Sequence, residues 1–277
     1  MRRPFPIRMI VTYAGLSIFY LGLLLPIAWL FLSSFRNSDS VQSGKLLPTW
    51  SELTFGNYLE TFQISNFVTY LVNSFVIAFS VMVLTVFLGS LGAYSLSRFR
   101  LKGKNLFMMA ALLPQFFPYV LVLIPFYVLM SNLNLVDSHI GLILTHTSLT
   151  LPFALWMLTG YFNAIPMELD QAALIDGCSR FGVLFRILYP VAIPGLVVAG
   201  FFAFVVSWGD YLFVSILSQS NETQTLPIGL QTFMTSLRVQ WGLITAGTVV
   251  AIVPTVIFFS IVQRRLVSGL TAGAVKS

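Results

Sequence analysis

Six long apolar stretches constrain this chain more than any other feature of its sequence. A run of about 20 apolar residues forms a helix long enough to cross the hydrocarbon core of a bilayer. A helix also satisfies its own backbone hydrogen bonds, for which lipid offers no partners. We therefore predict six membrane-spanning helices in a single transmembrane domain over residues 1–277, at residues 10–32, 71–96, 106–130, 140–162, 191–217 and 241–262.

Composition agrees with an all-α membrane protein and excludes an ordinary water-soluble domain. Charged residues make up 9% of the 277 residues, whereas soluble domains carry roughly 25%. The first stretch has 27 uncharged residues between Arg8 and Arg36, more than the apolar core of a signal peptide, roughly 7 to 15 residues long. We expect it to remain as a span.

Lysine and arginine are distributed unevenly between alternate connections. Twelve of the fifteen lie in the N-terminus, the second and fourth connections and the C-terminal tail, and the other three are Arg36, Lys45 and Arg238. Because short loops rich in these residues stay on the cytoplasmic side, we expect both termini and residues 166–190 in the cytoplasm. These positions at span ends also account for the net charge of +6 without a nucleic acid partner.

Residues 166–190 form a polar segment with five charged residues between two apolar stretches. Pro166 suits the first turn of a helix, and Gly177 supplies a left-handed end to it. Ser179 is suited to cap a second helix, which we expect Pro190 and Pro194 to interrupt. Two short helices outside the membrane would give a soluble partner something to bind.

At these residues the chain resembles the permease subunits of ATP-binding-cassette (ABC) importers. Their signature runs Glu-Ala-Ala, three residues, Gly, nine residues and Ile-x-Leu-Pro. Here it reads Gln171-Ala172-Ala173, Gly177 and Ile187-Leu188-Tyr189-Pro190, with Gln171 in place of Glu and Tyr189 in place of Leu. The resemblance implies the fold of type I importer permeases, with six transmembrane helices and a cytoplasmic coupling helix between spans 4 and 5. The residues that it assigns to contact with the ATPase are Glu168, Gln171, Ala172, Ala173, Asp176, Gly177 and Pro190.

The C-terminal tail, residues 264–277, is similar to the closing segment of the carbohydrate branch of this family. It contains Gly-Leu-Thr-Ala-Gly-Ala-Val-Lys over residues 269–276. Residues 225–230, Thr-Leu-Pro-Ile-Gly-Leu, are similar to the same branch. The resemblance implies that the tail contacts the ATPase subunits through Gly269, Thr271, Gly273 and Lys276.

The same resemblance implies the partners. They are a second, non-identical permease subunit, two ATPase subunits, an external solute-binding protein, a sugar substrate and membrane lipid. ATP and Mg²⁺ would be bound by the ATPase, and this chain would bind no cofactor and no metal. The complex would lie in the inner or plasma membrane of a bacterium or archaeon, and the permease would work by alternating access rather than as an enzyme.

Polar and helix-breaking residues inside the spans are candidates for the translocation path. Asp210 is the only acid within a predicted span, and Trp208 precedes it closely. An acid at the bilayer midplane needs a partner or a wet cavity, although Asp210 could also lie near the outer boundary. Gln115 stands between Pro114 and Pro118, which predict a kinked third span. Helix packing is the alternative for these residues, as it is for His146, which is expected to hydrogen-bond between helices.

Two other interpretations remain open from the sequence. The first is a permease of the same family for amino acids or another small solute. The second is a membrane-embedded enzyme or a proton-driven carrier. One cysteine, Cys178, and two histidines give no cluster with metal-ligand spacing and no nucleophile set, which speaks against catalysis.

Overall fold

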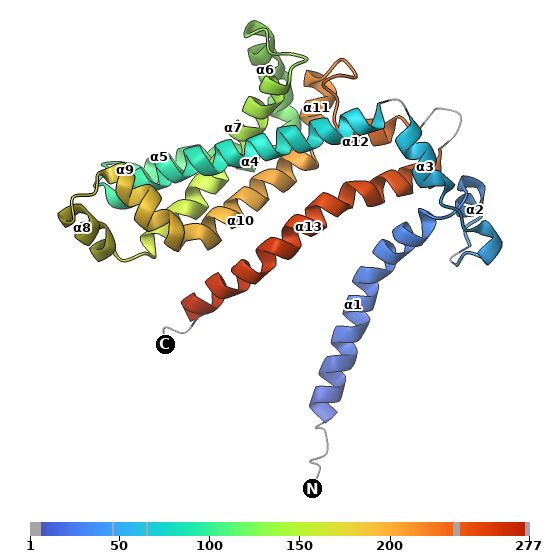
Figure 1. The fold of residues 1–277 in the computed structure, drawn as a ribbon, viewed down its shortest axis with the longest axis horizontal. Helices are drawn as coiled ribbons and strands as arrows, with labels where there is room; N and C mark the ends of the chain where they lie inside the picture. Colours follow the sequence, from blue (N-terminus) through green and yellow to red (C-terminus); the bar gives the residue numbers. More distant parts are fainter. Residues whose placement is uncertain (1–6, 46, 65, 235–238, 275–277) are drawn as a thin grey trace. The chain divides into compact units, whose positions relative to one another are not determined.

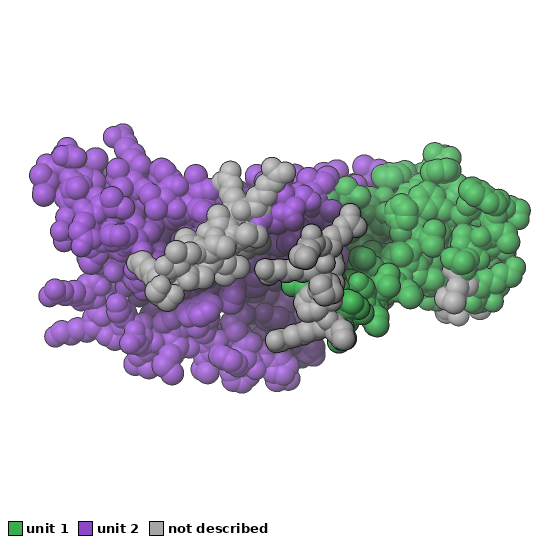
Figure 2. Space-filling model, turned by 90° about the horizontal axis from the view of Figure 1, so that it is seen from below, with its two compact units in different colours: residues 1–67, 230–253 green, residues 68–229, 254–277 purple. Residues whose placement is uncertain are grey.

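The computed structural model describes residues 7–45, 47–64, 66–234 and 239–274 (Figure 1). The regular secondary structure of this part of the chain is helical, and two isolated β-bridges are the exception. The chain divides into two compact units, one of residues 1–67 with 230–253 and one of residues 68–229 with 254–277 (Figure 2). The prediction of an all-α protein is confirmed for the described residues.

The first unit contains one long apolar helix and a folded connection. Its elements are α1 (Ile7–Ser33), α2 (Ser38–Gln42), η1 (Trp50–Glu52), α3 (Gly56–Gln63) and the first part of α13 (Trp241–Ala274). Arg36 is fully buried and donates to the carbonyl oxygens of Ser40 and Lys45, both at 2.8 Å. Asn57 Nδ2 donates in turn to the carbonyl oxygen of Arg36 at 2.9 Å. The connection after α1 is therefore held by its own polar core.

The second unit holds the helices around the candidate sites. They are α4 (Phe67–Arg98), α5 (Lys104–Leu112), η2 (Leu113–Phe116), α6 (Tyr119–Asn132), α7 (His139–Asn163), α8 (Met167–Ile175), α9 (Arg180–Gly182), η3 (Val183–Leu188), α10 (Tyr189–Trp208), α11 (Leu212–Leu217), α12 (Leu226–Gln231) and the end of α13. Figure 1 shows α8 at one end of the α4–α7–α10 bundle and α11 toward the other. We call these the α8 end and the α11 end.

Small residues let α4 pack closely on α7. A Cβ added at Gly92 would lie 2.7 Å from Leu155 Cδ1, and Ala93 is fully buried. Gly92 and Ala93 of α4 therefore belong to a helix-packing surface. On α10, a Cβ at Gly195 would lie 2.5 Å from the ring of Tyr161. These contacts place α7 between α4 and α10 in the core of the unit.

Within the described residues, five helices are long and apolar enough to cross a membrane, and a broken pair of helices would make a sixth. Lys104–Phe116 and Tyr119–Asn132 meet at a bend of 103°. Phe117 is extended there, with φ −87° and ψ 142°, as expected for a residue before proline. The predicted kink in residues 106–130 is confirmed, and it is a sharp break rather than a gentle bend.

The fifth predicted span differs from the expectation at both ends. The helix runs without interruption from Arg180 to Trp208, so the prediction that Pro190 and Pro194 break it is wrong. The turn before Pro190, Val183–Leu188, is π-helical, and its wider winding relieves the clash that proline makes with the preceding turn of an α-helix. Residues 209–211 then separate α10 from the short helix α11.

Candidate functional site

The polar segment predicted between spans 4 and 5 folds as α8 and a tight turn. Asp170 and Ala173 are buried and lie on the same side of α8. The other side is exposed, including Glu168, Gln171 and Ala172, and Ile175 is 86% exposed. Helix α8 thus packs on the rest of the unit through a narrow face, and most of its surface is exposed.

Gly177 ends α8 as predicted. Its φ is +86°, its N–H donates to the carbonyl oxygen of Leu174 at 3.1 Å, and the N–H of Cys178 donates to that of Ala173 at 3.0 Å. This pair of bonds is the Schellman motif, in which the left-handed residue is usually glycine. A Cβ at Gly177 would meet no atom of this chain within 4 Å, so the backbone conformation alone requires glycine.

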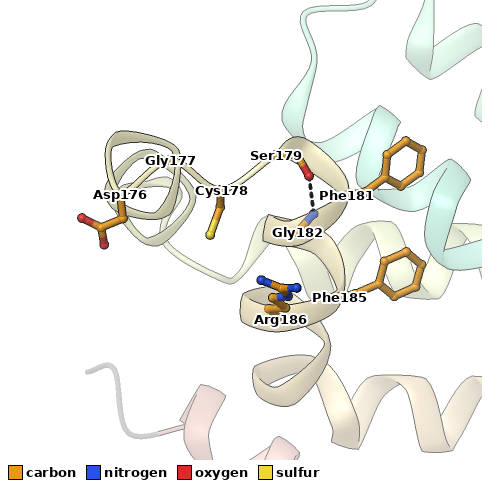
Figure 3. Close-up of a pocket in the computed structure, with 8 residues that line it drawn as sticks. All are labelled: Asp176, Gly177, Cys178, Ser179, Phe181, Gly182, Phe185 and Arg186. Atoms are coloured by element: carbon orange, nitrogen blue, oxygen red, sulfur yellow. Dashed lines mark hydrogen bonds between the residues drawn. The ribbon is translucent and has the colours of Figure 1, made fainter.

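The chain beyond Gly177 lines an open pocket of about 610 Å³. Ser179 Oγ accepts from the N–H of Gly182 at 3.1 Å and so caps α9, as predicted. Figure 3 shows Asp176 directed to one side of this segment and Phe181 and Phe185 to the other. The pocket therefore offers acidic, basic and aromatic side chains in a small area. Its lining is Asp176, Gly177, Cys178, Ser179, Phe181, Gly182, Phe185 and Arg186.

An ion pair between Arg98 and Asp170 joins α8 to α4. Arg98 Nε lies 2.6 Å from Asp170 Oδ2, and the two side chains are only 3% and 8% exposed. The sequence did not identify either residue as a partner of the other. The available signal was the position of Arg98 as the last residue of a long apolar run.

Tyr189, which departs from the family signature, also contacts α4. Its hydroxyl hydrogen-bonds Ser90 Oγ, a residue of α4. A leucine at this position could not make that bond. The neighbouring Pro190 is exposed at the start of α10, so its assigned contact with an ATPase stays a prediction.

A second polar cluster lies near the α11 end. His146 is 1% exposed, and its two ring nitrogens lie 2.8 Å from Ser207 Oγ and 3.2 Å from Asp210 Oδ2. Asp210 Oδ2 also accepts from the N–H groups of Phe213 and Val214, at 3.0 and 3.2 Å, at the start of α11. Asp210 therefore has the partner that an acid within a span needs, and His146 bridges helices as expected.

The other two translocation candidates belong to separate local contacts. Gln115 Nε2 donates to the carbonyl oxygen of Leu149 at 2.7 Å, and Tyr119 donates to Gln115 Oε1 at 3.1 Å. Trp208 is buried and stacks on Phe204 with ring centroids 5.5 Å apart. Gln115 and Asp210 are each partly exposed, whereas Trp208 is packed inside this subunit.

Asp137 anchors the connection that follows α11. Its Oδ1 accepts from the N–H groups of Gln219 and Ser220, at 2.9 and 3.0 Å, and from the hydroxyls of Ser220 and Thr223. The hydrogen bond from Thr223, followed by that from the Ser220 backbone, lowers the pKa of Asp137 to about 2. Sequence reasoning did not single out this residue.

The C-terminal tail continues α13. Gly269, Thr271 and Gly273 lie within this helix, which extends to Ala274, whereas Lys276 lies outside the described residues. Across the described ranges, no group of three or more His, Cys, Asp or Glu side chains is arranged to hold a metal ion.

A broken pair of helices beside a tightly packed bundle, with one polar helix exposed at its end, is an arrangement expected of a membrane transport subunit. Residues 85–271 match the family described as the binding-protein-dependent transport system inner membrane component. The chain belongs to this family, and it is a multi-pass inner-membrane component of such a transport system.

Curated relatives match nearly the whole chain. The inner membrane ABC transporter permease protein YcjP of Escherichia coli (strain K12) is 37% identical over 95% of each chain. The sulfoquinovosyl glycerol transport system permease SmoH of Agrobacterium fabrum is 36% identical over 96% of this chain and 93% of its own length. The trehalose transport system permease SugB of Mycobacterium tuberculosis is 36% identical over 91% and 92%.

A solved structure confirms the predicted permease fold. A chain of a bacterial ABC transporter involved in the import of the acidic polysaccharide alginate superimposes with a TM-score of 0.80, over 94% of this chain and 99% of that chain. Its sequence is 24% identical to this one. The likeness therefore establishes the arrangement of helices.

Proposed function

We propose that this chain is one permease subunit of an ATP-driven sugar importer and forms half of the translocation path with a second, non-identical permease. The observation that carries this proposal is the exposed face of α8 with its Schellman turn at Gly177. Carbohydrate specificity is supported by relatives whose names give sulfoquinovosyl glycerol, diacetylchitobiose and trehalose as transported compounds.

Alpha-helix α8 would be the docking element for an ATPase subunit. Its exposed face carries Glu168, Gln171 and Ala172, and the pocket beyond Gly177 adds Asp176 and Arg186. A partner with a basic group near the acids and an acid near Arg186 would be complementary to this surface. ATP and Mg²⁺ would bind to that partner. When the two ATPase subunits close on ATP, they would move α8, and the cavity between the two permease subunits would open alternately to the two sides of the membrane. This chain itself would bind no cofactor.

The α8 end would lie in the cytoplasm with both termini, and the α11 end would face the solute-binding protein. This orientation is supported by the twelve basic residues on one set of connections against three on the other. Single cysteines in a Cys178→Ala background test it in intact cells. Labels that cannot cross the membrane should react with residues 40–54 and not with residues 97–104, and the reverse result would contradict the orientation.

Gln115 and Asp210 are the side chains of this subunit that we propose at the sugar path, because each combines a hydrogen-bonding group with partial exposure. Such groups pair with sugar hydroxyls. Trp208 would support Asp210 from its buried position. The tail, with Gly269, Thr271, Gly273 and Lys276, would contact the ATPase subunits. Deletion of residues 271–277 should then leave membrane insertion intact and lower the sugar uptake.

Reconstitution tests the function as a whole. The tagged chain is purified with the products of its neighbouring genes and placed in proteoliposomes with the candidate binding protein. ATP-dependent accumulation of a labelled mono-, di- or oligosaccharide supports the proposal. Accumulation of amino acids alone, or of solute without ATP, would favour the alternatives of a different solute or an ion-driven carrier.

A further inference from the structure

Arg98 donates to three residues outside its own helix, one in α8, one in α7 and one in the link between them. Besides Asp170 in the first turn of α8, it donates from Nη1 to the carbonyl oxygen of Phe162 at 2.8 Å and from Nη2 to that of Ile165 at 3.1 Å. Phe162 lies in the last turn of α7, and Ile165 lies in the link to α8. One guanidinium group therefore joins α4, α7 and α8.

The electrostatics of this arrangement are favourable at each contact. The C-terminal end of α7 carries the negative end of its helix dipole, which a cation stabilises. Asp170 lies near the positive end of α8, which stabilises a carboxylate. Arg98 stands between the two, and arginine suits such a place because its planar group presents several donors in a fixed geometry.

The other attachment of α8 is to η3, the helical turn that follows it, and the apolar part that α8 contributes is small. Ala173 is its only buried apolar residue, and Leu174 is half-buried against the same cluster. The side chains of Glu168, Gln171 and Ile175 are exposed. Apolar contacts through such small surfaces resist separation but do not fix direction. Between α8 and α4, the directional contacts that the described residues make are the hydrogen bonds of Arg98 to Asp170.

We propose that Arg98 is a positioning residue that, through Asp170, makes α8 and the adjacent end of the membrane-spanning helix α4 move as one body. The inference rests on the proposed docking of an ATPase on α8. Displacement of α8 by the partner then reaches α4 directly, rather than being absorbed in the link of residues 164–166. The hydrogen bond between Tyr189 and Ser90 joins the start of α10 to the same helix α4.

The variants that test this proposal must not leave Asp170 as a buried charge without a partner. Replacement of Arg98 alone by an apolar residue leaves Asp170 unpaired in a buried place, which damages folding for a reason unrelated to coupling. Arg98→Met combined with Asp170→Leu removes both charges and keeps similar volumes, but makes no directional bond. Arg98→Lys keeps the charge with a single point of contact. Arg100→Gln is the matched control, because Arg100 is exposed and only two residues away.

The first measurement is the amount of solute transported per ATP hydrolysed by the reconstituted complex. We expect the double variant to retain its ATPase and to transport less per ATP by about fivefold or more. Arg98→Lys should fall between it and the wild type, and Arg100→Gln should match the wild type. A purely structural role would change the yield of complex but not this ratio.

The second measurement needs no ATPase. Amide hydrogen exchange in α8 of the membrane-embedded chain should be faster in the double variant than in Arg100→Gln, because α8 opens locally more often. If the wild-type chain retains no ATPase, the proposed function fails, and the exchange comparison still decides whether Arg98 holds α8.

Two results would overturn the proposal. One is a double variant with the wild-type transport ratio and wild-type exchange in α8. The other is failure of both the double variant and Arg98→Lys to accumulate in the membrane when Arg100→Gln does so, since the pair would then serve folding alone.

Discussion

The two ends of the second unit are held together in different ways. At the α8 end, long helices meet in a continuous apolar cluster, and a single ion pair orients the one helix that projects from it. At the α11 end, a second apolar cluster includes Phe213, Val214 and Leu217 of α11. Two carboxylates, those of Asp137 and Asp210, add hydrogen bonds there from the backbone N–H groups of short helices and connections. A packed core has few alternative arrangements, whereas single hydrogen bonds exchange with water or a ligand at a net cost of about 1 kcal/mol. Both ends have a packed core, and they differ in the hydrogen bonds of Asp137 and Asp210, which can exchange partners at the α11 end.

Gly177→Val tests the α8 end most severely. Positive φ costs a residue with a β-carbon on the order of 1–2 kcal/mol, and a β-branched residue adapts to it poorly. We expect the turn after α8 to change, so that the ATPase no longer co-purifies with the tagged chain, while membrane insertion stays normal. Binding-protein-stimulated ATP hydrolysis should be lost with it.

Gly177→Asn is the matched control for that experiment. Asparagine tolerates the left-handed conformation, and a Cβ at this position meets nothing in this chain. If Asn behaves as glycine and Val does not, the backbone conformation is responsible. Full retention of the ATPase and of its stimulation in Gly177→Val would contradict the assignment of α8 as the docking element.

His146→Ala is expected to have the next largest effect, and at the opposite end. The change leaves Ser207 Oγ without its imidazole partner in a buried place and removes a buried ring, so it should destabilise the chain by about 2–3 kcal/mol. Thermal unfolding of the purified subunit measures this loss. Because α8 lies outside the polar cluster of His146, Ser207 and Asp210, the ATPase should still co-purify with the variant. Loss of the ATPase would show that the α8 end and the α11 end are not independent.

Asp137→Asn should have a smaller effect, of about 1 kcal/mol, because this group is close to solvent and its interactions are screened. The pKa of Asp137 is lowered from 3.8 to about 2 in the folded chain. A depressed pKa contributes stability above the unfolded value, and this contribution is lost as the pH falls through the folded value.

The pH dependence makes that prediction specific. The difference in unfolding temperature between wild type and Asp137→Asn should be constant near neutral pH and shrink as the pH falls from about 4 to about 2. Ser215→Ala, in the neighbouring helix α11 and exposed, serves as a control without a pH effect. A difference that does not change over this range would refute the role assigned to the carboxylate.

Features that depend on neighbouring residues could be predicted from the sequence. The apolar stretches, the left-handed end at Gly177 and the cap at Ser179 each follow from a few adjacent residues. The kink near Gln115 follows from two prolines in the same way. Family membership likewise follows from the spacing of the signature in residues 171–190, which is kept although Gln171 and Tyr189 differ from the usual residues.

Features that depend on distant residues could not be predicted. Arg98 and Asp170 are 72 residues apart in sequence, and His146 and Asp210 are 64 apart. Only its place at the end of a long apolar run distinguishes Arg98 from the other basic residues of its connection, and that place does not identify its partner. The continuity of the helix through Pro190 depends on the π-helical turn before it, which proline rules do not reveal.

Gln171→Glu is the mildest test, because it restores the residue usual in the family at an exposed position of α8. Within the chain, Gln171→Glu has one small unfavourable and one small favourable electrostatic effect, which nearly cancel. The new carboxylate lies three residues after Glu168, where like charges repel by about 0.2–0.5 kcal/mol, and it gains slightly from the positive end of the helix. The effect on assembly therefore reports the partner's charge.

For Gln171→Glu we expect equal or tighter retention of the ATPase at low salt and a smaller difference at high salt, where exposed charges are screened. Gln171→Lys, of similar size and opposite charge, should weaken retention. If both variants weaken it equally, Gln171 makes a neutral hydrogen bond to the partner and no basic group faces α8 at this position.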